Sequence, residues 1–367
     1  MLVIALLYVF LVGVNGLGSG FKLLGRDLVQ NFFTATTNPF LGLMVGILAT
    51  TLVQSSSVST ALIVGLVAAP ENALPLTNAI PMIMGANIGT TVTNTIASMA
   101  HMGWKEEFRR AFAVATCHDF FNYLAVLLLL PLELFTGALS RIAHALAGLL
   151  AGFSGARYES PVKGAIEAGS APIEAVVQAV APTQAWAAAL VILLSGALIY
   201  LALVAIIRVM RSAMRARVEV LVSRAFENNA IVAMVVGVIT TVMVQSSSIT
   251  TSLLVPLAGA GVLTLAQAFP ITLGANVGTT ITALLAALAA TGPNAEAGLT
   301  VALVHLVFNL TGILVIYPWE RIRNIPLSAA RHLADVAARS KVLAILYVLI
   351  LFYGIPTLFA ITGHVFG

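Results

Sequence analysis

Charged side chains are scarce in this chain of 367 residues: Asp, Glu, Lys and Arg make up 9%, whereas 60% of the residues are hydrophobic. Soluble domains carry about 25% charged residues, which cover their water-facing surface. The deficit excludes an ordinary soluble fold and predicts a surface that mostly faces lipid. The net charge of +4 does not indicate nucleic-acid binding, because the basic residues lie between apolar segments, as the positive-inside rule expects.

Cysteine is almost absent as well. Cys117 is the single cysteine, which excludes an intramolecular disulfide and a cysteine-based metal site. No HExxH or comparable metal-ligand spacing occurs, so we expect no cofactor and no metal other than a transported ion. The first apolar stretch, Met1 to Val14, has no preceding basic residue and no cleavage signature, which favours a retained membrane helix over a signal peptide.

The chain contains an internal repeat. GILATTLVQSSS at 46–57 recurs as GVITTVMVQSSS at 237–248, and PMIMGANIGTTVT at 81–93 recurs as PITLGANVGTTIT at 270–282. Farther along, a His, a Phe and an Asn recur at matching spacing: His118, Phe121, Asn122 and His305, Phe308, Asn309. Several polar motifs recurring in order within an apolar background indicate a duplicated structural unit.

We predict an all-α polytopic membrane protein of two inverted repeats with discontinuous helices. Repeat 1 covers 1–155, a short outer loop covers 156–183, and repeat 2 covers 184–367. Apolar length and breaking residues predict crossing helices near 1–16, 73–100, 111–132, 184–207, 265–290, 298–317 and 342–363. Amphipathic, interfacial segments are expected near 20–33 and 209–227.

Two further apolar stretches, about 40–69 and 231–261, are interrupted at their centres by Gln-Ser-Ser-Ser. Each half is too short to span about 30 Å of hydrocarbon. We interpret each stretch as a re-entrant helical hairpin with this QSSS motif at its tip, because irregular backbone at membrane depth needs protein or a water-filled cavity around it. The alternative is a straight helix that contains serines.

Basic residues set the predicted orientation. They gather in three segments: Lys105, Arg109, Arg110; Arg208, Arg211, Arg215, Arg217, Arg224; and Arg321, Arg323, Arg331, Arg339, Lys341. Placing these segments in the cytoplasm puts the N-terminus there too. An odd number of crossings then inverts the second repeat, provided that 137–154 does not cross, which the sequence leaves open. Inverted repeats with discontinuous helices are typical of secondary transporters.

The surroundings of the QSSS motifs are almost free of charge. Glu71 is the one charged residue between Leu28 and Trp104, and none lies between Asn228 and Ala295. An ion at the tips must therefore be held by neutral groups. Serine hydroxyls and the free N–H groups of a broken helix suit a small oxyanion. The candidate phosphate-binding residues are Gln54, Ser55, Ser56, Ser57, Gln245, Ser246, Ser247 and Ser248.

Amide, hydroxyl and carbonyl oxygens near the same tips also suit sodium. The candidate sodium-binding residues are Gln54, Ser57, Asn87, Thr90, Thr91, Asp119, Asn122, Gln245, Ser248, Asn276, Thr279 and Thr280. Glycines at 85, 89, 274 and 278 flank the asparagines and would let the backbone unwind and approach closely there. The alternative is that the small residues only let helices pack closely. His118 and Asn122 share one helix face, and we expect a hydrogen-bonded, structural histidine that supports the hairpins.

Asp119 breaks the symmetry of the repeats, since its counterpart is Leu306. It lies inside the apolar segment 111–132, and an intramembrane carboxylate is a functional hypothesis by default. A bound cation would be its least costly partner. The alternative is a carboxylate that reaches the basic segment and pairs with Arg109 or Arg110.

The sequence resembles the type II sodium–phosphate cotransporters over nearly its whole length, in the manner of a bacterial member. The stretches that carry the resemblance are NPFLGLMVGILATTLVQSSSVSTALIVGLV, IPMIMGANIGTTVTNTI, EFRRAFAVATCHDFFNYLAVLLLLPLE, the second QSSS block and VLAILYVLILFYGIP. The resemblance implies a secondary active transporter, not an enzyme, that couples inward Na⁺ movement to phosphate uptake by alternating access. Phosphate would lie between the QSSS hairpins, and the family's VHD motif reads Cys117-His118-Asp119, which implies electrogenic transport.

The resemblance also implies the partners and the location: inorganic phosphate, Na⁺ and the lipid bilayer of the plasma (cell inner) membrane. The oligomeric state stays open, a dimer included. The chain departs from the pattern of the family's animal members in two places. The loop 155–183 is short and lacks cysteine, and His101, Trp104 and Ala275 occupy the positions of residues proposed for a further sodium site in animal members. Competing hypotheses are transport of another oxyanion such as arsenate or sulfate, phosphate export, and a passive channel. An intramembrane hydrolase is disfavoured because no GxSxG elbow occurs at QSSS.

Overall fold

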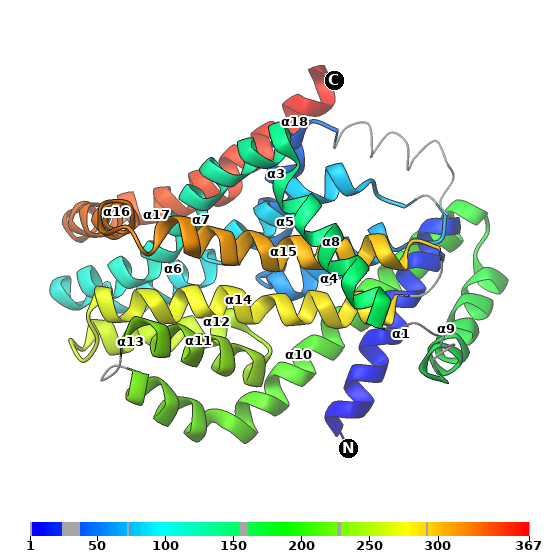
Figure 1. Cartoon of the computed structure of the whole chain (residues 1–367), viewed down its shortest axis with the longest axis horizontal. Helices are drawn as coiled ribbons and strands as arrows, with labels where there is room; N and C mark the ends of the chain where they lie inside the picture. Colours follow the sequence, from blue (N-terminus) through cyan, green and yellow to red (C-terminus); the bar gives the residue numbers. More distant parts are fainter. Residues whose placement is uncertain are drawn as a thin grey trace.

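The computed structural model describes residues 2–23, 37–71, 73–153, 161–225, 229–290 and 293–366, and all regular structure in these ranges is helical (Figure 1). Within these ranges, five helices are long and apolar enough to cross a membrane. They cover Lys105–Thr136, Gln184–Ile206, Leu265–Leu288, Ala295–Ile316 and Lys341–Ile361. The predicted class, an all-α membrane protein, is confirmed.

These five helices match five of the seven predicted crossings. They are α7 (Lys105–Thr136), α10 (Gln184–Ala225), α14 (Leu265–Ala289), α15 (Ala295–Ile316), and α17 (Lys341–Val348) continued through a π-helical turn (Leu349–Gly354) into α18 (Ile355–Phe366). The predicted crossing 1–16 lies in α1 (Leu2–Leu23), whose apolar part, Ile4–Leu17, is shorter. The predicted segment 209–227 is no separate element, because α10 continues to Ala225, and most of 20–33 lies outside the described residues.

The predicted crossing 73–100 is wrong as a single helix. It is divided into α5 (Leu76–Gly89) and α6 (Val92–Ser98), with a 3-10 turn (Met99–His101) after them. The break falls at Thr90 and Thr91. The Thr90 hydroxyl accepts a hydrogen bond from the Ser56 backbone N–H at 3.1 Å, and the Thr91 hydroxyl donates to the Ile88 carbonyl at 2.8 Å. In the second half α14 runs unbroken through the matching threonines.

Three helices lie outside the predicted crossings and hairpins, and the first of them occupies 137–154, the segment whose crossing the sequence left open. These are α8 (Ala138–Phe153), α9 (Pro161–Val180) inside the predicted outer loop, and α16 (Glu320–Arg339) inside a predicted basic loop. Helix α16 is amphipathic: Leu327, Ala330, Ala334 and Ala337 are buried, and α16 packs against α7. Their spacing of three and four residues is that of a helix face, so the basic charges mark the exposed side of a helix.

Each predicted hairpin is broken at its QSSS motif. Helix α3 (Pro39–Val53) is followed by α4 (Ser56–Val67), and α11 (Ala230–Val244) by α12 (Ser247–Ser252) and α13 (Leu254–Gly259). Asn38 and Asn229 cap the first helix of each hairpin, accepting hydrogen bonds from Phe40 and Val232 N–H groups at 3.0 Å. The helical breaks confirm this part of the prediction, and the straight-helix alternative is wrong.

Glycines hold each hairpin against the helix that follows it. A Cβ at Gly85 would lie 2.0 Å from the Leu43 carbonyl oxygen, and one at Gly46 would lie 2.1 Å from that of Met82. In the second half, a Cβ at Gly274 would lie 1.9 Å from the Met234 oxygen. The pairs α3–α5 and α11–α14 are therefore in backbone contact. Gly274 and Gly278 lie within unbroken α14, so the predicted unwinding there is wrong, whereas the predicted close approach of the backbones is confirmed.

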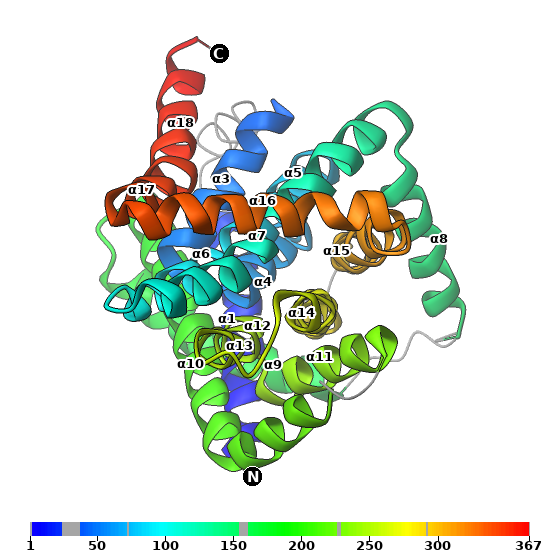
Figure 2. The same cartoon turned by 90° about the vertical axis from the view of Figure 1, so that its left-hand side faces the viewer.

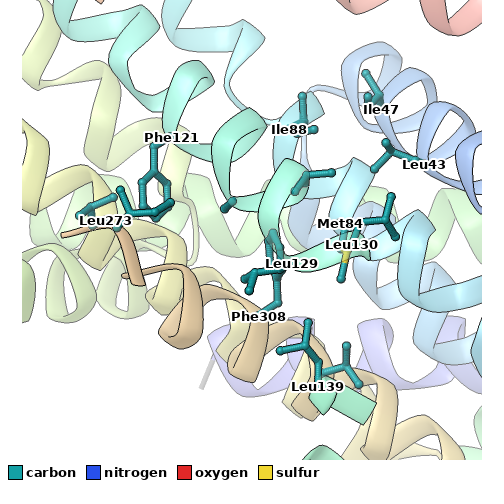
Figure 3. Close-up of a cluster of buried hydrophobic side chains, with 14 of the residues drawn as sticks. Leu43, Ile47, Met84, Ile88, Phe121, Leu129, Leu130, Leu139, Leu273 and Phe308 are labelled. Carbon is teal, nitrogen blue, oxygen red and sulfur yellow. The ribbon is translucent and has the colours of Figure 1, made fainter. Parts of the chain in front are cut away.

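The main apolar core joins the two halves of the chain (Figure 3). Phe121 and Leu129 of α7 lie with Phe308 of α15 and Leu273 of α14, while Met84 belongs to α5. Phe121 and Phe269 of α14 meet edge to face, with ring centroids 5.9 Å apart. Elements of both repeats thus form one core around α7 and α15.

We predict that Gly274→Ala destabilises the protein by about 1–3 kcal/mol, because the new methyl group overlaps the Met234 carbonyl and the helices must separate. The measurement is thermal unfolding of purified protein in detergent. Gly196→Ala is the matched control, since a Cβ at that helical glycine meets nothing within 4 Å. Equal unfolding temperatures for the two variants would contradict the backbone contact.

Candidate ion-binding site

The two QSSS tips have the same local structure. Gln54 and Gln245 adopt φ of 55° and 56°, the left-handed region that non-glycine residues enter at a penalty of about 1–2 kcal/mol. The next residue at each tip, Ser55 or Ser246, caps the following helix, its hydroxyl accepting from the N–H three residues on at 3.3 Å. Glycine would adopt this left-handed conformation without strain. Two glutamines at equivalent positions therefore indicate that the glutamine side chain is needed there.

The tips differ in how their glutamines are held. The Thr282 hydroxyl donates to the Gln245 amide oxygen at 3.2 Å, and the Gln245 amide nitrogen donates to the Val242 carbonyl at 2.7 Å. Thr93 matches Thr282 in the repeat, yet its buried hydroxyl has no hydrogen-bond partner in the described part of the chain. Gln54 is exposed. The second tip is thus bonded to its neighbouring helix through the Gln245 side chain, whereas the first tip is bonded to its neighbour through the Ser56 N–H and the Thr90 hydroxyl.

Four helices meet at a buried network of histidines and asparagines, which we call the His–Asn network: His118, Asn122, Asn87, Asn276, His305 and Asn309. His118 of α7 bonds to Asn276 of α14 at 2.6 Å, and His305 of α15 bonds to Asn87 of α5 at 3.2 Å. Each histidine therefore pairs with the asparagine of the other repeat. All six side chains are at most 2% exposed.

The asparagines complete this network between them. The Asn276 amide nitrogen donates to the Asn122 oxygen at 2.8 Å, and the Asn87 amide nitrogen donates to the oxygens of Asn122 and Asn309 at 3.2 and 3.1 Å. The Asn122 amide nitrogen donates to the Asn87 backbone carbonyl at 2.8 Å. His118 and Asn122 do support the hairpins, but through α5 and α14, which pack on α3 and α11.

Asp119 lies on α7 beside this network and has different partners. It is fully buried, and one carboxylate oxygen accepts hydrogen bonds from the Thr95 hydroxyl at 3.1 Å and the Tyr347 hydroxyl at 2.9 Å. The other oxygen has no partner among the described residues. The alternative of pairing with the basic segment is wrong: Arg109 pairs with Glu106 and Asp335 at 3.0 and 3.4 Å, and Arg110 donates to the Gly259 carbonyl at 3.0 Å.

The candidate residues thus fall into separate groups and not one cluster. Asn87, Asn122 and Asn276 belong to the His–Asn network, whereas Thr279 and Thr280 bond within α14, to the carbonyls of Ala275 and Val277. Thr91 bonds to the Ile88 carbonyl at 2.8 Å, and its side chain also interacts with the Asp119 carboxylate. The QSSS serines stay at the tips, where Ser56, Ser57 and Ser247 are buried and Ser248 is half-buried.

Four polar residues of these groups were missed: Asn94, Thr95, Thr282 and Tyr347. Asn94 of α6 accepts from Thr251 and Ser252 of the second hairpin at 2.9 and 3.2 Å, which links the repeats. The repeat match of Thr282 with Thr93, and the one-turn spacing of Thr95 from Thr91, could have indicated two of them. Nothing in the sequence pointed to Tyr347, which lies 228 residues from Asp119.

The described residues contain no group of three or more His, Cys, Asp or Glu side chains able to hold a metal ion. The polar interior instead offers amide, hydroxyl and carbonyl groups with one carboxylate. Such groups suit weakly held ions: oxygen ligands for a hard cation, and hydroxyl and N–H donors for an oxyanion.

Fold and site together define a polytopic, all-helical membrane protein with a nearly uncharged polar interior. The chain belongs to the Na⁺/Pi-cotransporter family, whose model matches residues 9–157 and 198–330. It is 32% identical over 442 residues to human sodium-dependent phosphate transport protein 2B, and 34% identical over 425 residues to protein 2A of Rattus norvegicus. Both alignments cover 97% of this chain but 64% and 66% of the relatives, so the chain spans about two thirds of their length. No solved structure matches.

We predict that His118 and Asn276 are energetically coupled. Replacing each with Ala, singly and together, should give a coupling free energy of about 0.5–3 kcal/mol, because either single variant leaves the other side chain without its partner. The measurement is unfolding in mixed detergent micelles. His118→Ala combined with Asn294→Ala is the control, since Asn294 bonds to the Ala69 carbonyl instead. Additive effects for His118 and Asn276 would contradict the cross-repeat pairing.

Proposed function

We propose that this protein is a secondary active transporter, and not an enzyme, that couples inward Na⁺ movement to uptake of inorganic phosphate by alternating access. The observation that carries the proposal is the pair of equivalent helix breaks at QSSS in a chain of the Na⁺/Pi-cotransporter family. The relatives' names, sodium-dependent phosphate transport proteins, give both ions.

Phosphate binds at the QSSS tips in this proposal. At each tip the chain leaves a helix, passes through one left-handed glutamine and begins a new helix with consecutive serines. Serine hydroxyls of that new turn, with those of its N–H groups that are not bonded to Thr90 or to the capping serines, donate to an oxyanion without a fixed positive charge. Neutral donors also favour release, because charge-assisted bonds from arginine are about twice as strong.

Sodium binds on the neighbouring oxygen atoms, with Asp119 as the one charged ligand. An unpartnered buried carboxylate oxygen is unfavourable, and a cation would compensate for its charge. The Thr95 and Tyr347 hydroxyls orient the other oxygen. Gln54, Ser57, Thr90 and Thr91, with Gln245, Ser248, Thr279 and Thr280 in repeat 2, supply further neutral oxygens near the tips.

The part of the proposal that concerns alternating access is supported by a difference between the tips. The Gln245 side chain is held by Thr282 and the Gln54 side chain is exposed, and such an asymmetry between repeats is expected of an inverted-repeat transporter that is open to one side. The proposal keeps the N-terminus cytoplasmic and the protein in the plasma (cell inner) membrane, by the positive-inside rule.

We expect purified protein in proteoliposomes to accumulate phosphate when an inward Na⁺ gradient is imposed, and to lose that accumulation when K⁺ or choline replaces Na⁺. Ser56→Leu should abolish uptake while the protein remains folded, since the substitution removes a buried hydroxyl and fills its space. Uptake at the same rate in choline would contradict sodium coupling. Normal uptake by the Ser56→Leu variant would place phosphate elsewhere.

We expect Asp119→Gly to retain phosphate uptake but to lose its dependence on membrane potential. Divalent phosphate with two Na⁺ carries no net charge, so a third Na⁺ at Asp119 makes each cycle move one positive charge. That charge is worth about 2.3 kcal/mol per 100 mV. The measurement is uptake at imposed potentials set by K⁺ and valinomycin, with Leu306→Gly as the matched control on α15. Equal voltage dependence in wild type and Asp119→Gly would remove Asp119 from the coupling.

A further inference from the structure

One end of the molecule carries a pocket of about 270 Å³ that lies apart from the tips and the His–Asn network. Its walls come from the first turns of α7, the turn that precedes α14, and α16, which lie together in Figure 2. Arg109, Arg110 and Arg331 line it with Thr264 and Leu265. Arg110 and Asp119 are nine residues apart on α7, so about 14 Å of helix separates this pocket from the Asp119 group.

The three arginines differ in the hydrogen bonds and ion pairs that they already make. Arg110 is held by the carbonyls of Ala258 and Gly259, which fix its guanidinium at the pocket wall without neutralising it. Arg109 pairs with Glu106 and Asp335. Arg331 makes no hydrogen bond or ion pair with the described part of the chain, although Asp335 lies one helical turn from it on α16. Three arginines against two carboxylates leave the pocket with a net positive charge of one.

The backbone adds to this positive charge. Thr264 is the N-cap of α14, a helix of 25 residues, and Leu265 is its first residue, so the positive end of the helix dipole lies at the pocket wall. The lining residues include no carboxylate. Planar guanidinium groups beside a helix N-terminus match the geometry and charge of a phosphate group.

We propose that the Arg109–Arg110–Arg331 pocket binds a phosphate group in addition to the transported ion. Arg331 is its free ligand, Arg110 a fixed one, and Arg109 exchanges part of its pairing with Glu106 and Asp335 for the bound anion. The group belongs either to free inorganic phosphate or to the headgroup of an anionic phospholipid. The inference does not depend on the proposed transport function.

The test is protection of Arg331 from phenylglyoxal, a reagent that modifies accessible guanidinium groups, with peptide mass spectrometry as the readout. Arg339 is the internal control, because it is exposed on the same helix and does not line the pocket. Delipidated protein in Na⁺-free detergent solution receives inorganic phosphate in one arm, phosphatidylglycerol in a second, and chloride at equal ionic strength in a third. The rate at which phenylglyoxal modifies Arg331 should fall by at least about threefold once the site is mostly occupied.

The pattern of protection identifies the source of the group. Protection by inorganic phosphate identifies a free-anion site, and protection by phosphatidylglycerol alone identifies a lipid site. Protection by neither probe, equal protection by chloride, or equal protection of Arg339 would overturn the proposal. Repeating the arms in Ser56→Leu separates this pocket from the proposed transport site, since the protection of Arg331 should persist there. Arg110→Gln should weaken the protection, whereas Arg323→Gln, whose guanidinium lies over the Tyr317 ring, should leave it unchanged.

Discussion

The requirement that buried polar groups find partners organises this molecule around the crosswise hydrogen bonds of the His–Asn network. A buried donor or acceptor that loses its partner destabilises a protein by about 1–3 kcal/mol. Because His118 bonds to Asn276 and His305 to Asn87, neither half of the chain can satisfy its own interior. Helices α7 and α15 are thereby fixed against α14 and α5, and the apolar core of Phe121 and Phe308 closes around the same contact.

The need for partners or for solvent also decides where the charged side chains lie. The ion pairs of Arg109 lie at the exposed end of α7, and α16 turns its basic residues outward while its alanines pack inward. Two carboxylates of α7 are buried. Glu133 accepts from the N–H groups of Leu139 and Ser140 at the start of α8, whereas Asp119 accepts from the hydroxyls of Thr95 on α6 and Tyr347 on α17. The C-terminal helices, for which the repeat motifs gave no role, thus complete the surroundings of Asp119.

Much of this arrangement could be predicted from the sequence, because polar motifs are conspicuous in an apolar chain. The repeat, the helix breaks at QSSS and five long apolar helices follow from local pattern. Contacts between distant residues could not be predicted. The spacing of His118 and Asn122 shows a shared face but not that the partner lies 158 residues away. The Thr90 hydroxyl accepts from the Ser56 N–H, a tertiary contact that local propensity does not contain. Helix α16 was missed because its arginines were read as a loop, although its alanines follow a helical period.

The glycine contacts have a mechanical consequence. Where a carbonyl oxygen lies about 2 Å from the place of an absent Cβ, sliding one helix by a single residue, about 1.5 Å, would drive a side chain into backbone. Gly46 and Gly85 therefore lock the register of α3 on α5, as Gly237 and Gly274 lock that of α11 on α14. Each pair of helices is therefore expected to keep its register as one unit that carries a QSSS tip. A rearrangement of one tip relative to the other would then change the contacts between the pairs and not those within them.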